Sequence, residues 1–410
     1  MKTWWRMFTV TNSMIPIPTK DALKLVWDIV SKVRKLMFFI KNSTKCREIL
    51  ARLQISLGDD HLLQVSLDVR TRWNSTLKLV TRALDLKDSI TKFLKFFRSP
   101  LGKEEFKGSK TKLDNIEEKE WAILQGISHL LGSLESATRY LSGEKYASFV
   151  TALPVLWSIE DKIGNKRLFE FENSDLERSK FKRNFHGQYG NEPFFNGVVW
   201  ILNACRVLLL NEFISRFEGI NEAIVWTTLL NPRFHMKSEH FKNEVESTMT
   251  KELLTEKVED IAVCAATLVF NEANNTVESS SSDESEDENT INLFSSWKKH
   301  KSNTELRVLV ATATEQAKAQ AKQEVLSYLV ATEALVNSNF DPLEWWIGNK
   351  MRYPNVAVVA RQWLSVPATS TPSERVFSIC GIVNTAKRSS SSGKSIENQV
   401  FIHNNKGVLE

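Results

Sequence analysis

The sequence predicts a mostly α-helical protein, and three observations support this. Apolar residues recur at spacings of three and four over most of the chain, which is the pattern of one buried helix face. Ten prolines and fifteen glycines are few for 410 residues, whereas twelve tryptophans and twenty-three phenylalanines are many. These counts favour long helices packed through bulky aromatics over a turn-rich β protein.

The N-terminal two thirds divide into a leader and a helical region. Residues 1–18 end in two prolines and are expected to be a disordered leader, because proline interrupts helical hydrogen bonding. Residues 19–270 are expected to be helical, with a short strand near 62–68, where apolar and polar residues alternate imperfectly. Residues 98–114 are polar, basic and glycine-containing, which predicts a loop.

The acidic segment interrupts this helical pattern. Residues 271–304 contain four consecutive serines and the run Asp283–Glu288, and such a like-charge tract cannot bury apolar surface. We expect a disordered insert, in which the serines are either phosphorylation sites or part of a solvated spacer. Residues 305–406 then form a helical C-terminal region.

Charge and cysteine usage limit the function classes. The net charge is +5, and five acidic residues lie in the run Asp283–Glu288, so the rest of the chain is clearly basic. This suits weak nucleic-acid affinity, or a scatter of solvated lysines. The four cysteines are far apart, so we expect no metal site, reduced thiols and a cytosolic or nuclear protein. No membrane partner is expected, and no nucleotide-binding, hydrolase or metalloprotease motif is present.

The first candidate site is a pair of helices that begins at the tryptophan pair. Trp345 and Trp346 point to different faces of a helix, so one can be buried while the other reaches a partner. In the helix that follows Pro354, the apolar residues include Val359, Trp363 and Leu364 at helical spacing. These residues suit either subunit pairing or an intramolecular core.

Glu374 is the second candidate. Thr371, Pro372 and Glu374 match a capping box, with Thr371 as N-cap and Glu374 reaching back to an orphan amide. The alternative is a metal-binding carboxylate. Two-metal phosphoryl chemistry needs several converging carboxylates, which one Glu cannot supply, so the capping role is favoured.

The third candidate is the Arg72–Trp73 pair, which follows Asp68. Arginine can contact a phosphate and tryptophan can stack on an unpaired base. The alternative is that Trp73 packs in the core and Arg72 pairs with Asp68. A basic loop around Lys103–Lys112 could add further phosphate contacts.

The order of several motifs resembles hAT-superfamily transposases and the BED-zinc-finger proteins derived from them. Residues 341–346, 353–354, 366–370 and 373–378 are similar to their C-terminal dimerisation segment. Upstream, residues 67–76 resemble the family's strand and TRWNST motif, and residues 230–234 resemble part of its helical insertion.

The resemblance implies a helical insertion domain plus the closing helices of an interrupted, incomplete RNase H-like fold. It implies dimerisation through Trp345, Trp346, Val359, Trp363, Leu364, Arg375 and Phe377, with itself or with related hAT proteins. Glu374 matches the third catalytic acid, and Arg72–Trp73 matches a pair that contacts DNA.

The family's first two catalytic aspartates and its BED finger have no counterpart before Asp21. We therefore expect a truncated, catalytically inactive, nuclear chain without a cofactor, since Mg²⁺ would bind only in a complete catalytic domain. The alternatives are a DNA-binding transcription regulator, or a residual transposase if upstream sequence is missing.

Overall fold

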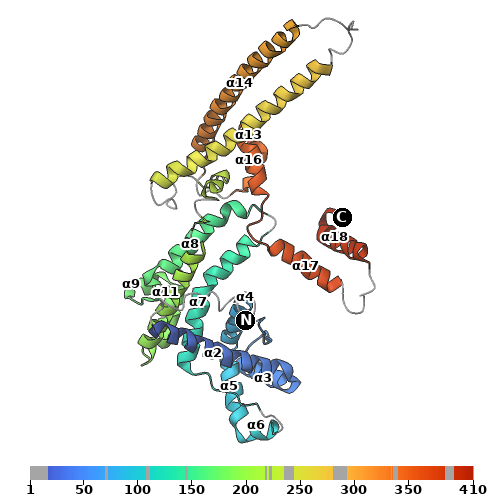
Figure 1. Ribbon diagram of the computed structural model, residues 1–410. Coiled ribbons are helices and arrows are strands. Elements are labelled where there is room, and N and C mark those ends of the chain that lie inside the picture. Colours follow the sequence, from blue (N-terminus) through green and yellow to red (C-terminus); the bar gives the residue numbers. More distant parts are fainter. Residues whose placement is uncertain are drawn as a thin grey trace. The chain divides into compact units, whose positions relative to one another are not determined.

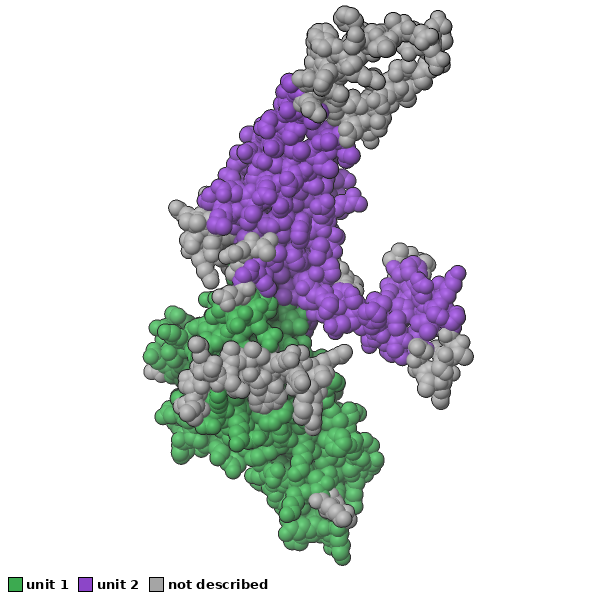
Figure 2. All heavy atoms as spheres, in the orientation of Figure 1, with its two compact units in different colours: residues 1–138, 156–218 green, residues 139–155, 219–410 purple. Residues whose placement is uncertain are grey.

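The computed structural model describes residues 17–69, 73–107, 111–143, 146–217, 219–220, 224–234, 244–279, 293–333, 335, 340–383 and 392–409. Over these residues the elements are helices, as the sequence predicted, and none is a strand (Figure 1). The chain forms two compact units, one of residues 1–138 and 156–218, the other of 139–155 and 219–410 (Figure 2). The predicted division at residues 270 and 304 follows composition and not packing, and it stays a prediction.

Unit 1 is built from short and medium helices. They are α2 (Ile17–Asn42), α3 (Thr44–Leu57), α4 (Trp73–Asp85), α5 (Lys87–Arg98), α6 (Pro100–Glu105), most of α7 (Glu118–Leu141), most of α8 (Ala152–Gly164), η2 (Lys166–Phe169), α9 (Asn173–Arg178), α10 (Lys180–Tyr189) and α11 (Phe195–Phe217).

Helix α2 is central to unit 1, and its buried face follows from its sequence. Ile29, Val33, Met37 and Ile40 have no exposed surface, and their spacing places them on one side of the helix. This side contacts α3, α4 and α11. Because α2 begins at Ile17, Pro18 lies in its first turn, where proline leaves no helical hydrogen bond unmade. The remaining leader residues, 1–16, lie outside the described residues.

The predicted strand at 62–68 is wrong. Residues 62–69 form neither a helix nor a strand, and no described segment pairs with them as a strand. The side chain of Gln54 instead pairs with the backbone of Leu63: its Nε2 donates to the carbonyl at 3.1 Å and its Oε1 accepts from the amide at 2.8 Å. One amide side chain thus replaces a neighbouring strand at this point.

The expected loop at 98–114 also contains a helix. Ser99 caps α6 by accepting from the amide of Gly102 at 3.1 Å, and Pro100 occupies the first turn. Serine followed by proline is a start signal that the basic composition of the segment concealed.

Helix α11 is the most apolar long helix. By length and composition it is the one helix among the described residues that could cross a membrane. In unit 1 it contacts α2 and buries seven side chains, including Arg206, whose Nη1 donates to the carbonyl of Ile163 at 2.8 Å.

Unit 2 contains η1 (Phe149–Thr151), η3 (Val225–Leu230), α13 (Glu244–Ser279), α14 (Leu293–Glu333), α15 (Pro342–Asn349), α16 (Pro354–Leu364), α17 (Thr371–Val383) and α18 (Gly393–Leu409). Helices α13 and α14 lie side by side (Figure 1). Together they extend into both ends of the predicted disordered insert, because 271–279 and 293–304 are helical. The acidic run Asp283–Glu288 lies outside the described residues.

Candidate functional site

One buried cluster holds α15 and α16 in place. Tyr328 on α14 donates its hydroxyl to the carbonyl of Leu229 at 2.5 Å, and Trp346 donates its indole N–H to the carbonyl of Leu230 at 2.8 Å. The rings of Tyr328 and Trp346 stack with centroids 5.2 Å apart. These two hydrogen bonds join the C-terminal end of η3 to α14 and α15. The Tyr328 hydroxyl is wholly buried, which raises its pKa well above the usual value and keeps it a donor.

The N-terminus of α16 is capped by another helix. The Glu324 carboxylate on α14 accepts from the amide of Val356 at 2.8 Å and from the side-chain amide of Asn355 at 2.8 Å. Orphan amide groups and the helix dipole both favour a negative charge here. Tyr353, which precedes α16, provides no side-chain cap, so Glu324 fulfils that role from 32 residues away.

Five of the seven predicted dimerisation residues belong to this cluster or pack on it. Trp346, Val359 and Leu364 are buried, and Trp345 and Trp363 are partly buried against it. Trp363 stacks on Phe149 with ring centroids 5.5 Å apart. In this structure these five side chains pack within the chain's own core or against it. Their role in pairing stays a prediction.

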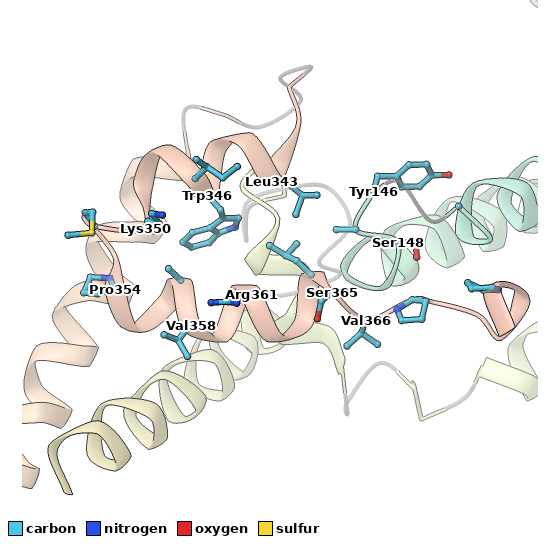
Figure 3. Close-up of a pocket in the computed structure, with 18 residues that line it drawn as sticks. Tyr146, Ser148, Leu343, Trp346, Lys350, Pro354, Val358, Arg361, Ser365 and Val366 are labelled. Carbon is cyan, nitrogen blue, oxygen red and sulfur yellow. The ribbon is translucent and has the colours of Figure 1, made fainter. Parts of the chain in front are cut away.

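A mainly apolar groove lies over the same helices (Figure 3). Its volume is about 870 Å³, and α15, α16 and residues 143–148 supply most of its lining. Ile347 and Met351, 69% and 86% exposed, line it with Val358. Lys350 and Arg361 are its charged lining residues.

Helices α17 and α18 contact each other and leave large apolar side chains open. Helix α17 buries no side chain, and Phe377 and Ile382 on it are 74% and 71% exposed. On α18, Phe401 and Ile402 are 60% and 55% exposed. Of the predicted residues, Arg375 and Phe377 thus lie on this exposed pair of helices.

Residues 142–148 fix the start of α17. Arg375 donates from Nη2 to the carbonyl of Ser142 at 2.8 Å, and the hydroxyls of Ser142 and Thr371 are 3.3 Å apart. The hydroxyl of Ser148 accepts from the amide of Ala368 at 3.1 Å. These contacts hold both sides of the turn that enters α17.

The predicted capping box at Thr371 is wrong in its details. Helix α17 already includes Thr371, whose hydroxyl shares a hydrogen bond with the hydroxyl of Ser142. The carboxylate of Glu374 instead accepts from the hydroxyl of Ser370 at 3.3 Å. Glu374 is exposed, and among the described residues no three His, Cys, Asp or Glu side chains gather in a way that could hold a metal ion.

The Arg72–Trp73 pair is only partly within the described residues. Arg72 lies outside them, and Trp73 is half-buried at the start of α4. Asp68, considered as a partner of Arg72, is bound by Arg34, whose Nη2 is 2.6 Å from Oδ2, and by the hydroxyl of Thr76 at 2.9 Å. Burial acts to raise the pKa of Asp68, but the hydrogen bonds and charge of these partners outweigh it and lower the pKa.

Sequence reasoning missed the groove residues Ile347 and Met351 and the anchoring residues Ser142 and Ser148. Leu343, Ile347 and Met351 recur every four residues, a spacing that indicates one apolar face. The anchors carry no such signal, since Ser142 acts through its backbone carbonyl on a residue 233 positions away.

Two regions of the chain match known protein families. Residues 324–406 match the hAT family C-terminal dimerisation region, and residues 10–124 match the ZBED1 RNase-like helical domain. The groove-forming helices α15 and α16 and the exposed pair α17–α18 lie almost wholly in the first match.

Three curated proteins are similar over most of this chain. Zinc finger BED domain-containing protein 4 of Homo sapiens is 22% identical over 95% of the chain and 27% of its own length. Zinc finger BED domain-containing protein RICESLEEPER 1 of Oryza sativa subsp. japonica is 20% identical over 86% of the chain and 44% of its own length. The Putative AC transposase of Zea mays is 21% identical over 90% of the chain and 40% of its own length.

The chain thus spans less than half the length of each of these relatives. The recognition from sequence motifs is confirmed: the chain carries a hAT C-terminal dimerisation region and a ZBED1-type helical region, and its relatives are BED-zinc-finger, hAT transposase-derived proteins.

Proposed function

We propose that this chain forms dimers, with itself or with related hAT proteins, through the exposed surfaces of α15–α18. The observation that carries the proposal is the set of open apolar side chains on α17 and α18, within the residues that match the dimerisation region. Contiguous exposed apolar surface is rare on monomers and typical of protein interfaces.

Light scattering during size-exclusion chromatography tests the proposal. We expect a dimer at micromolar concentration, which Phe377→Asp and Ile382→Asp convert to monomer because a carboxylate would be buried unpaired. Ile55→Asp is the matched control, since Ile55 is 62% exposed on α3, in unit 1. A monomeric wild-type chain, or equal mass for all four proteins, would contradict the proposal.

We propose further that this chain does not cut DNA and that its helices are the insertion and closing helices of an RNase H-like fold. The helical match over 10–124 supports the second statement. The first is supported by Glu374, whose exposed carboxylate bonds Ser370 at the start of α17. A cleavage assay with Mg²⁺ or Mn²⁺ tests it, and specific strand cleavage that Glu374→Gln abolishes would refute it.

DNA binding is the second candidate function, in a nuclear, transposase-derived protein. It is favoured by the pairing of Asp68 with Arg34, because this pairing neutralises a carboxylate beside the start of α4 that would otherwise repel a phosphate. A gel shift at rising salt tests it, since phosphate contacts make affinity fall steeply with salt. We expect Arg72→Ala and Trp73→Ala each to weaken binding, and no shift at low salt would remove this candidate.

A further inference from the structure

We infer that the groove over α15 and α16 seats the α17–α18 helix pair of a second copy of this chain, so that two copies exchange these contacts reciprocally. This inference rests on the proposed dimerisation and names the two surfaces that meet. Both the groove and the helix pair expose apolar side chains, and the groove carries cations that acidic residues of the helix pair can meet.

Within the part of the chain that the structure describes, no segment covers the groove. Leu343, Ile347, Met351 and Val358 line it and are 36%, 69%, 86% and 44% exposed. Figure 3 shows Leu343 and Val358 along this groove together with Trp346, which is buried. Leaving these apolar side chains in water is unfavourable, so the groove suits an apolar helix.

The α17–α18 helix pair also exposes large apolar side chains. Phe377 and Ile382 on α17, and Phe401 and Ile402 on α18, are each more than half exposed. Val400 is the one residue of α18 with a buried side chain among those described. Two helices alone cannot bury apolar residues that lie on more than one face, so this pair requires a third surface.

The chain's own helix pair is held away from its own groove. Ser142 binds both Thr371 and Arg375, and Ser148 binds Ala368, which fixes the turn and the first turns of α17. The lining of the groove includes Pro372 but no later residue. Among the described residues, helix α17 therefore leaves the groove where it begins, and the α17–α18 pair of the same chain does not fill it.

Charge and size agree with a second copy. The groove lining includes Lys350 and Arg361 but no Asp or Glu. The helix pair exposes Glu374 and Glu397, which can meet these cations, together with Lys394 and with Arg375, which already donates to Ser142. A two-fold axis makes every such contact twice. Stable interfaces bury about 800 Å² per partner around an apolar centre, and the open residues of groove and helix pair provide this centre on each copy.

Cross-linking between two distinguishable copies tests the inference. The full chain is prepared with Cys264→Ser and Cys380→Ser, which leaves only the buried Cys46 and Cys205. Met351→Cys is then introduced in one tagged copy and Phe377→Cys in another of different size. After mixing, self-association is measured by light scattering, and a short bismaleimide is added.

The inference predicts a covalent product that joins the Met351→Cys copy to the Phe377→Cys copy, at least tenfold above either product of like copies. Ile347→Cys with Ile382→Cys is a second pair, also at exposed positions, in case one variant is poorly folded. Helix pairs that meet each other would instead join Phe377→Cys copies together. A chain that carries both cysteines and links only within itself would show that the groove is filled from its own chain.

Either of the last two results overturns the inference, and they separate it from the proposed function. A dimer by light scattering without groove-to-helix products leaves dimerisation standing and removes only the groove as its seat. A monomer at every concentration contradicts both.

Discussion

The indole N–H of Trp346 donates to the backbone carbonyl of Leu230 at 2.8 Å, across 116 residues of sequence. This bond ties α15 to the last residue of η3, and Trp346 itself lines the groove. It gives the second residue of the tryptophan pair a structural role within its own chain. A partner would therefore contact mainly the exposed groove residues, such as Ile347 and Met351, and not the buried Trp346.

We expect Trp346→Phe to lower the free energy of unfolding by about 2 kcal/mol, because the Leu230 carbonyl would be left buried without its donor. Trp345→Phe is the matched control, since Trp345 is only partly buried against the same cluster, and it should cost clearly less. Urea unfolding followed by circular dichroism measures both. Equal losses would show that ring packing, and not the hydrogen bond, determines the effect.

Two buried tyrosines provide a second comparison. The hydroxyl of Tyr328 bonds the Leu229 carbonyl, whereas the hydroxyl of Tyr353 is buried without a partner among the described residues. Tyr328→Phe should cost about 1–2 kcal/mol, and Tyr353→Phe should be neutral or slightly stabilising, because it removes an unpaired polar group. A stability loss in Tyr353→Phe as large as that in Tyr328→Phe would contradict this assignment.

The capping role of Glu324 is tested on its own helix. Glu324→Ala removes the acceptor of two donors at the start of α16, and we expect a loss of about 1–2 kcal/mol. Glu315→Ala, also on α14, removes a surface pair with Lys318 and should change stability by less than about 0.5 kcal/mol. Thermal unfolding of the two variants distinguishes them, and a shared shift in Tm would argue against the cap.

Acid stability depends on Asp68 in unit 1. Burial acts to raise its pKa, but the bonds from Arg34 and Thr76 lower it on balance. The unfolded state then binds the proton more readily, so this carboxylate stabilises the fold above its unfolded pKa of about 4. That contribution is lost as the pH falls through the lower, folded pKa.

Asp68→Asn should therefore be less stable than the wild type at pH 7, with the difference shrinking below about pH 4. Asp85→Asn, which removes an exposed carboxylate at the end of α4, is the control for the loss of an acidic group in unit 1. Unfolding midpoints between pH 2 and pH 7 measure this. A difference that stays constant over this range would show that Asp68 is not ionised in the folded protein.

The sequence predicted the helices well where one apolar face repeats for several turns. The helix after Pro354 was predicted from such a face, and Val359 and Leu364 on α16 are buried as their spacing indicates. The strand at 62–68 failed because alternation describes a half-buried extended segment without providing the neighbour it needs. Gln54 provides that neighbour, and no local pattern could reveal it.

The sequence predicted where in the chain the candidate site lies, but not which of its side chains are buried and which are exposed. The motif order located the dimerisation region, and Arg375 and Phe377 lie on its exposed helix. Burial of Trp346, Val359 and Leu364 depends on η3, α13 and α14, which are distant in sequence, so spacing alone could not separate core from surface. The same holds for Thr371, whose hydroxyl is bound by Ser142 across 229 residues.

Sedimentation equilibrium over nanomolar to micromolar concentration tests the central claim, that the C-terminal helices pair two chains, most directly. We expect the wild-type mass to rise to twice the chain mass of 46.9 kDa, and Phe377→Asp to remain at the mass of one chain, because its carboxylate would be buried in the interface. A wild-type chain that stays at 46.9 kDa at every concentration, or a Phe377→Asp variant that pairs as the wild type does, would contradict it.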